Sequence, residues 1–408
     1  MNNHDSVIVK KLLLFLPFFF LLSILMLPSL YAEESPFAGG GYLKNFLIYS
    51  DNGDTGFNTL ARLRLRLDYE PSDTFSGELA YEIMPQYRGH AGNPEYSVIQ
   101  APDPFSYRAF DLDERLYPGT GDPDRHLTVT QNLDRAYLTI SRRAFDLYIG
   151  RQPVAFGAAH VINPTDIIAP FTYNTIAREE RAGADAVRLK LPTGRMGEID
   201  IGIVFGDRFK YSNSAAFLRL KSYILKTDST VMAMIFRKNV LLGLDLSRSI
   251  GGAGTWLETA YVFPYKGSNE NYIRLSAGSD YSFTDNLYAY IEYHYNSAGR
   301  SDTVDYFKVL NTTAYTEGSV YLLARHYLAP GFRYQISPLL TFTGQALINL
   351  NDGSVLISPL FEYSLADDTF LVSGAYIGTG EDSSDGFAPG SEFGLYPDVY
   401  FVSLNVYF

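Results

Sequence analysis

Between Thr59 and Met84 the chain alternates apolar and charged residues with a period of two. Leucine alternates with arginine from Arg62 to Leu67, and in the second run Leu79, Tyr81 and Ile83 alternate with Glu78, Ala80 and Glu82. A Pro-Ser-Asp turn at 71–73 separates the two runs, so the pattern predicts a β-hairpin with one apolar and one charged face. A soluble sheet would bury the apolar face, whereas a membrane barrel turns it to lipid and the charged face to a wet lumen. The hairpin alone leaves both folds open.

The first residues have the layout of a secretory signal peptide. Lys10 and Lys11 precede an apolar run from Leu12 to Leu27, and Ala32 is followed by acidic residues. We expect cleavage after Ala32 and leave residues 1–32 out of the fold. An uncleaved anchor helix is disfavoured because the apolar run is short for a membrane span.

The last residues, Tyr400–Phe408, form an amphipathic strand that ends in an aromatic ring. A final strand of a soluble protein could carry the same pattern. The stretch resembles the closing strand of bacterial outer-membrane barrels, which their assembly machinery reads. Together with the signal peptide, the resemblance implies export to the outer membrane and a barrel-assembly partner that binds the strand ending in Phe408.

Composition agrees with a barrel in a membrane. The chain has 28 Phe and 32 Tyr, enough rings for an aromatic girdle at each interface, and it has no cysteine. Its net charge of −12 becomes −13 when Asp5, Lys10 and Lys11 leave with the signal peptide. Such an acidic chain is not expected to bind nucleic acid.

The rhythm of strands and turns predicts an all-β fold. Residues 33–408 read as one transmembrane antiparallel up-and-down barrel of eighteen strands, or of sixteen if strands near 230–247 merge with their neighbours. Short turns alternate with long segments near 85–132, 153–182, 296–320 and 380–397. All of these long segments fall at one end, which is the extracellular end in such barrels.

Strand parity sorts the polar residues. The predicted pore-lining residues are Arg62, Arg64, Arg66, Glu78, Glu82, Arg135, Gln152, Arg188, Lys190, Arg219, Lys221, Arg274, Glu292 and Arg333. The opposite parity is disfavoured because each lipid-facing arginine at the midplane costs about 2–4 kcal/mol. The alternative is that these charges only solvate the lumen wall and pair across strands.

The three arginines of the hairpin form a ladder along one wall. An even register would set Arg66 near Glu78 and Arg62 near Glu82, which leaves Arg64 opposite Ala80 without a cross-strand partner. We therefore expect Arg64 to face a permeating solute. Guanidinium groups bind carboxylates in two-point fashion, so the ladder predicts a preference for anionic solutes.

The segment near 153–182 opens on Gly-Arg-Gln-Pro-Val-Ala-Phe-Gly at 150–157 and continues with Asn-Pro-Thr-Asp at 163–166. This motif resembles uncharacterised proteobacterial porin-like barrels and is similar to the alginate-export-type group. The resemblance implies a loop that folds inward and narrows the pore, with Arg151, Asn163 and Asp166 in the constriction. The alternative is a turn-rich external loop. Parity points Gln152 inward and Arg151 outward, unless Gly150 marks a bulge.

Catalytic signals are weak, and no cofactor or metal site is predicted. Glu292 and His294 form an inward Glu-x-His pair, which is more typical of lumen lining than of a catalytic or metal site. Acidic clusters at 111–114, 122–124 and 381–382 lack the spacing of a calcium loop and read as solvated.

The sequence therefore predicts a non-enzymatic channel for passive diffusion of small hydrophilic, anionic solutes, with lipid and solutes as partners. A dedicated exporter of an acidic polysaccharide and a barrel enzyme are the alternatives. The sequence leaves open the solute, and whether the barrel is a monomer or a homo-oligomer.

Overall fold

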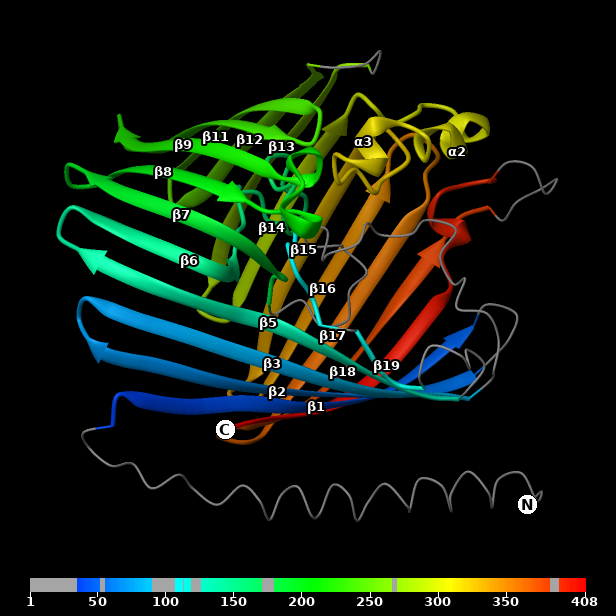
Figure 1. Cartoon of the computed structure of the whole chain (residues 1–408). Helices are drawn as coiled ribbons and strands as arrows, with labels where there is room; N and C mark the ends of the chain where they lie inside the picture. Colours follow the sequence, from blue (N-terminus) through cyan, green and yellow to red (C-terminus); the bar gives the residue numbers. More distant parts are fainter. Residues whose placement is uncertain are drawn as a thin grey trace.

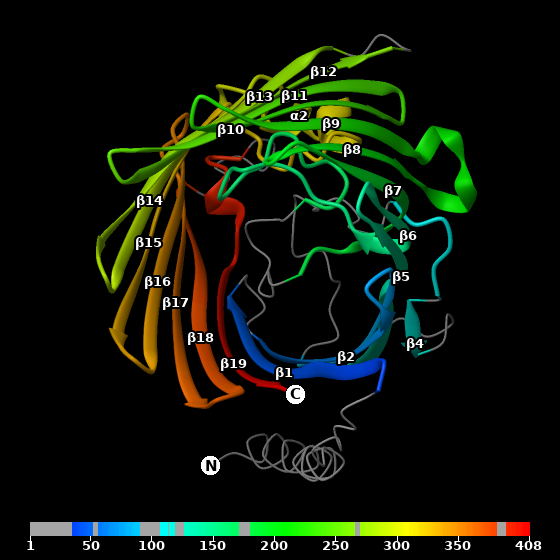
Figure 2. The ribbon, with the colours of Figure 1, turned by 90° about the vertical axis from the view of Figure 1, so that its left-hand side faces the viewer.

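The computed structural model describes residues 35–51, 56–89, 107–112, 114–118, 126–170, 180–265, 270–381 and 389–408. The predicted signal peptide lies outside these residues. The sheet closes on itself because β1 (Phe37–Asp51) pairs with both β2 (Gly56–Ser72) and β19 (Asp398–Tyr407). Apart from the three-residue β4 (Arg115–Tyr117), the described residues form a closed antiparallel barrel of eighteen strands (Figures 1 and 2). The predicted fold class is confirmed, and the alternative of sixteen strands is wrong.

Neighbouring strands in the chain are neighbours in the wall. The remaining strands are β3 (Phe75–Arg88), β5 (Leu127–Arg142), β6 (Phe145–Pro153), β7 (Gly183–Thr193), β8 (Gly197–Val204), β9 (Ala215–Ile224), β10 (Thr227–Phe236), β11 (Asn239–Ile250), β12 (Ala253–Pro264), β13 (Tyr272–Thr284), β14 (Leu287–Asn296), β15 (His326–Ser337), β16 (Leu340–Asn349), β17 (Val355–Ala366) and β18 (Thr369–Thr379). The helical turns are η1 (Asp207–Phe209), η2 (Tyr211–Asn213), η3 (Thr303–Asp305), α2 (Tyr306–Val309), α3 (Thr313–Thr316) and η4 (Phe393–Leu395).

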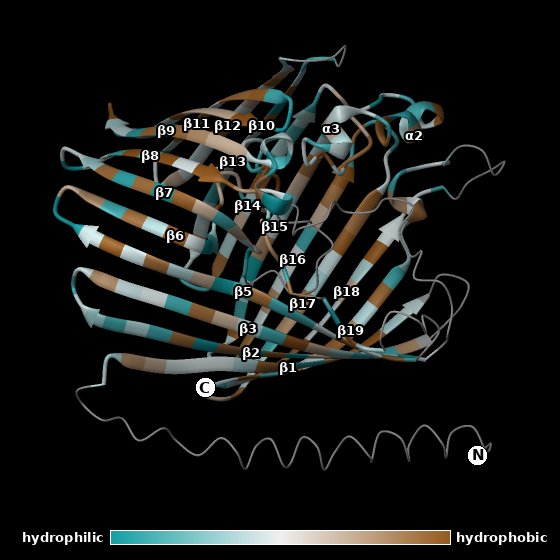
Figure 3. Cartoon of the chain, viewed as in Figure 1, coloured by the Kyte–Doolittle hydropathy of each residue, from teal (hydrophilic) through white to brown (hydrophobic). Residues whose placement is uncertain are grey.

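The outer surface of the barrel is apolar. Leu65 and Leu67 of β2 are 47% and 42% exposed, whereas Arg64, the residue before Leu65, is only 3% exposed. Figure 3 shows hydrophobic and hydrophilic residues in alternation along the strands that are visible in this view. Because the sheet formed by the described residues closes on itself and its outer face is apolar, the barrel meets both conditions for standing in a bilayer. No helix among the described residues is long and apolar enough to cross a membrane.

The connections differ at the two ends of the barrel. Tight turns such as 73–74, 143–144 and 367–368 close one end, which we name the turn end. The long connections follow β3, β6, β14 and β18 and lie together at the other end, which we name the loop end. The connection after β14 runs on to Arg325, beyond the predicted end of this long segment near residue 320. Helical turns occupy this stretch because Asp302 and Thr312 accept hydrogen bonds from backbone N–H groups that begin them.

Two clusters of buried hydrophobic side chains cover part of the inner face at the loop end of the barrel. We name residues 154–170, which follow β6, the strap. Phe156, Ile167 and Ile168 of the strap pack against inward side chains of β9 to β12 in the first cluster. In the second cluster, residues of α2, β15 and η4 pack with Val161 and Ile162 of the strap. Much of the inner face at this end is therefore covered by protein.

The strap leaves a gap in the wall where it departs. β6 ends at Pro153, but β5 continues further toward the loop end, and there β4 pairs with its free edge. Next to β4, Tyr107 and Ala109 bond to Asp185 at the start of β7. We name residues 107–112 and 114–117 the wall patch. Its exposed Phe110, Leu112 and Leu116 continue the apolar outer surface.

Candidate pore constriction

The strap is fastened to the opposite wall by two buried glutamates. Glu258 of β12 is fully buried, and its Oε2 accepts the backbone N–H groups of Ala158 and Ala159 at 3.1 and 3.0 Å. Its Oε1 accepts the backbone N–H and the hydroxyl of Thr165 at 2.8 and 2.7 Å. Asn163 also donates to Glu258, at 3.2 Å. One carboxylate thus satisfies donors from both ends of a tight reversal in the strap.

Glu292 of β14 fastens the middle of the strap. It accepts the backbone N–H groups of His160 at 2.7 Å and Ile162 at 2.9 Å. The indole N–H of Trp256 also donates to it, at 2.9 Å. Hydrogen bonds to a charged acceptor are the strong ones in proteins. The strap is therefore fixed across the inside of the barrel (Figure 2).

Gly157 permits this arrangement. Its φ of +99° is in the left-handed region that favours glycine, and a Cβ at this position would stand 2.5 Å from Oε2 of Glu258. The Gly at the end of the motif is therefore needed both for the turn and for the approach of the anchoring carboxylate.

The far end of the strap is tied back to the wall near β7. Asp166 is buried and forms an ion pair with Arg181, whose guanidinium also donates to the carbonyl of Ala169 at 2.8 Å. The Arg181 carbonyl in turn accepts a hydrogen bond from Arg135 at 2.7 Å. Asn163 and Asp166 thus lie on the inward strap, where the sequence motif predicted the constriction; that they narrow the pore stays a prediction.

The expected hairpin register is wrong. Arg64 lies opposite Glu82 and Arg66 opposite Ala80, two residues away from the predicted pairing. The cause is an irregularity between Tyr69 and Ser72, which lengthens β2 before the turn.

Arg64 is consequently not without a partner. Its Nη1 lies 3.0 Å from Glu82 Oε1 and 2.6 Å from Asp134 Oδ2, and it also contacts Glu180. The three carboxylates stand within 4.8 Å of one another, with this guanidinium bound to each. Arg62 bonds to the same Glu82. The prediction that Arg64 is the free arginine of the ladder is therefore wrong.

Two neighbouring residues point inward at Asp134 because the pairing of β3 and β5 shifts there. Asp134 is 2% and Arg135 5% exposed, and their side chains bond to each other at 2.6 Å. Strict alternation would have turned Asp134 to lipid, which is why sequence reasoning missed it. A bulge leaves no signal in the alternation beyond one charged residue out of phase.

Arg151 and Gln152 are both buried, at 5% and 2% exposed. Gly150, with φ of +121°, lets the backbone turn so that successive side chains avoid the lipid face. Arg151 bonds to Asp185, to Asp111 and to the carbonyl of Phe110. It joins β7 to the wall patch, so it stands in the wall where the strap departs.

Four of the other predicted pore-lining residues form ion pairs with neighbouring acids. Arg188 bonds to Asp200 through two nitrogens at 2.8 and 2.6 Å, and Arg219 reaches the same carboxylate at 3.4 Å. Lys190 pairs with Glu198, and Lys221 pairs with Asp228.

Arg66 has a side chain 55% exposed beside Asp68, Glu78 accepts from Tyr137, and Arg333 is exposed. Arg274 and Glu292 lie inside the barrel but are covered, at 5% and 1% exposed. That these residues line the pore stays a prediction.

The structure brings Ser276 to His294, which sequence reasoning missed. Ser276 Oγ lies 2.8 Å from His294 Nδ1, the approach of a nucleophile to a base. However, the Ser276 hydroxyl donates to the Ile162 carbonyl at 2.6 Å, and both side chains are buried beneath the strap. The pair therefore binds the strap to the wall. Asp111, from a predicted solvated cluster, bonds to Arg108 and Arg151 instead; residues 122–124 lie outside the described residues.

A closed eighteen-stranded barrel with an apolar outer surface has the architecture of porin-like outer-membrane β-barrels. Among solved structures, the chain is similar to Acinetobacter baumannii OccAB2, with a TM-score of 0.55, 10% identity, and coverage of 91% of this chain and 98% of that chain. It is similar to Pseudomonas aeruginosa OccK8 (OprE), with a TM-score of 0.55, 10% identity and coverage of 91% and 98%. The outer membrane protein OprD of Pseudomonas aeruginosa matches with a TM-score of 0.54, 10% identity and coverage of 92% and 94%. No family model and no curated protein matches the sequence.

Proposed function

We propose that the protein is a passive outer-membrane channel for small hydrophilic solutes, with a constriction formed by the strap. The observation that carries this proposal is the fastening of the strap by Glu258 and Glu292 inside a closed barrel. The loop end lies outside the cell, as in barrels of this class. The fold shared with OprD and the Occ proteins supports a channel of the same general type.

The wall beside the strap supports a preference for carboxylate-bearing solutes. Arg188 and Arg219 both form ion pairs with one carboxylate, that of Asp200. The guanidinium of Arg219 stands 5.1 Å from the ring centre of Phe156, at the start of the strap. Arg64, by contrast, is surrounded by carboxylates. Because low-dielectric walls focus the field at the narrowest point, Arg219 replaces Arg64 as the arginine most suited to face a solute.

Reversal potentials across a salt gradient test this preference. We expect the native channel in a planar bilayer to be anion-selective and Arg219→Gln to reduce that selectivity. Arg64→Gln should shift the selectivity toward cations by more than Arg219→Gln does, because Glu82, Asp134 and Glu180 then lose the arginine that they share. A native channel selective for cations would overturn the preference for anionic solutes, and a folded protein without conductance would overturn the channel itself.

The export of an acidic polysaccharide stays the second candidate, because an arginine-bearing wall also suits a uronate polymer. Two observations weigh against the exporter. The strap is bound inside the barrel to Glu258 and Glu292, and both of these glutamates are buried. Block of the conductance by a uronate polymer, with no block by the monomeric uronate, would favour the exporter.

We also propose that the barrel-assembly machinery binds the last strand. β19 is the strand that closes the barrel, and the Phe408 carbonyl accepts a hydrogen bond from Gly41 of β1 at 2.8 Å. This contact forms only when the barrel closes, so a partner could hold the strand before then. Deletion of Phe408 should reduce the amount of protein inserted in the outer membrane without changing its conductance.

A further inference from the structure

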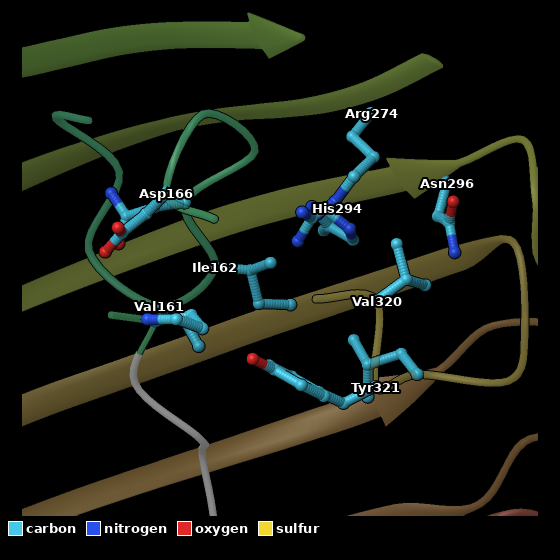
Figure 4. A pocket seen from close by; sticks show the side chains of 11 residues that line it. Val161, Ile162, Asp166, Arg274, His294, Asn296, Val320 and Tyr321 are labelled. Atoms are coloured by element: carbon cyan, nitrogen blue, oxygen red, sulfur yellow. The ribbon is translucent and has the colours of Figure 1, made fainter. Parts of the chain in front are cut away.

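A small cavity lies between the strap, the inner wall and the connection after β14. It is lined by Ile162 and Asp166 of the strap, by Arg274 and Asn296 of β13 and β14, and by Val320 (Figure 4). The space open to the centres of water-sized molecules is about 20 Å³, room for one or two small species. A carboxylate-bearing solute does not fit.

Arg274 forms no ion pair among the described residues, although the charge of Glu258 acts on it from further away. Its side chain is 95% buried, since 5% remains exposed, and its Nε has no hydrogen-bond partner. Its contacts are two long ones, from Nη1 to the carbonyls of Pro164 at 3.4 Å and Gly318 at 3.5 Å. Burying an unpaired cation costs several kcal/mol. An anion bound at this position would offset that cost.

Asn296 presents a second free donor to the same cavity. It lies directly opposite Arg274 in the pairing of β13 with β14, it is fully buried, and its Nδ2 has no partner. Asp166 does not pair with Arg274: its Oδ2 binds Arg181, its Oδ1 has no hydrogen-bond partner, and its carboxylate points away from Arg274 and Asn296 in Figure 4. The two unpartnered donors are thus a cation and an amide that face one small cavity.

We propose that this cavity binds a small monovalent anion such as chloride, held by Arg274 Nε and Asn296 Nδ2. The anion neutralises the buried guanidinium and satisfies both donors. It lies between the facing strands β13 and β14 and the strap residue Ile162, so its binding stabilises the folded position of the strap. The site lies behind the strap, apart from the path proposed for solutes.

Thermal unfolding of the purified full-length barrel in detergent tests the site, with Trp256 as the reporter because it is the one tryptophan of the chain and contacts Glu292. Sodium chloride or bromide is titrated against sodium gluconate at equal concentration. Because the anion binds the folded state, the unfolding temperature should rise by about 2 °C or more for each tenfold increase in halide above the dissociation constant. A crystal grown in bromide should show an anomalous peak beside Arg274.

Two variants separate the anion from a buried water. Asn296→Asp places a carboxylate beside Arg274, so it should abolish the halide response and raise the unfolding temperature in gluconate. Arg274→Gln should also abolish the response, and Arg188→Gln, whose arginine is paired with Asp200, should retain it. Equal unfolding temperatures in chloride and gluconate, or an unchanged halide response in Asn296→Asp, would overturn the proposal.

Discussion

Replacing Glu258 with Gln should release the strap while leaving the barrel wall intact. The carboxylate accepts hydrogen bonds on both oxygens, from Ala158 and Ala159 on one and from Thr165 on the other. An amide has one acceptor oxygen, so one of the two sets loses its acceptor whichever way the side chain turns. Each buried N–H left without a partner costs about 1–3 kcal/mol, and the remaining bonds lose their charge assistance.

A cost of about 2–5 kcal/mol follows, which raises the population of the open strap by a factor of roughly 30 to several thousand. Hydrogen exchange of the backbone amides at 158–165 should accelerate by that factor, because local opening exposes them. Single-channel recordings should show larger and noisier openings than the native channel.

The matched control is Glu362→Gln, which neutralises an inward acid of β17 far from the strap in the chain. It should leave exchange at 158–165 and the channel noise unchanged. If Glu258→Gln exchanged at the native rate in a folded barrel, the carboxylate would not be the group that fastens the strap.

Three further outcomes are expected. Gly157→Ala should displace Glu258 and reproduce the exchange and noise of Glu258→Gln, since its Cβ would stand 2.5 Å from the carboxylate; a native-like recording would contradict this. Burial raises the pKa of Glu392 from 4.5 to about 8. The packed connections around it should therefore be most stable below about pH 4.5 and progressively less stable as the pH rises to about 8, and Glu392→Gln should remove this dependence in limited proteolysis. Leu65→Arg puts a charge on the lipid face and should cost about 2–4 kcal/mol, lowering the denaturant midpoint of the barrel in lipid vesicles; an unchanged midpoint would place Leu65 outside the apolar belt.

Alternation sufficed to predict the strands, because residues such as Leu65 and Arg64 must face different solvents wherever a wall separates lipid from the interior. It also predicted on which side the long connections gather. It did not predict the register of β2 with β3 or the inward turn of Asp134, because each depends on one extra residue in a strand. A period of two carries no record of where such a shift occurs.

The alternation pattern also could not predict which inward-facing residues are covered by other segments of the chain. Parity turned Arg274 and Glu292 inward without indicating whether water or another segment meets them. The strap and the connection after β14 cover both, and Glu292 binds backbone N–H groups rather than a solute. The Gly-rich motif predicted that the chain would turn inward, but the anchoring glutamates lie about a hundred residues further along the chain.

The wall patch, in the connection after β3, and the strap, in the connection after β6, are expected to evolve together. β6 ends at Pro153, where the strap leaves the wall and β5 continues without it. Lipid chains would reach the polar interior there unless the wall patch covered the opening. Arg151 makes contact with Asp111 on one side and Asp185 on the other, so its loss would unseat the cover as well as the strap. Natural variation at positions 108–111 should accordingly be correlated with variation at 151 and 185, and grafting the strap into a relative should succeed only when the wall patch travels with it.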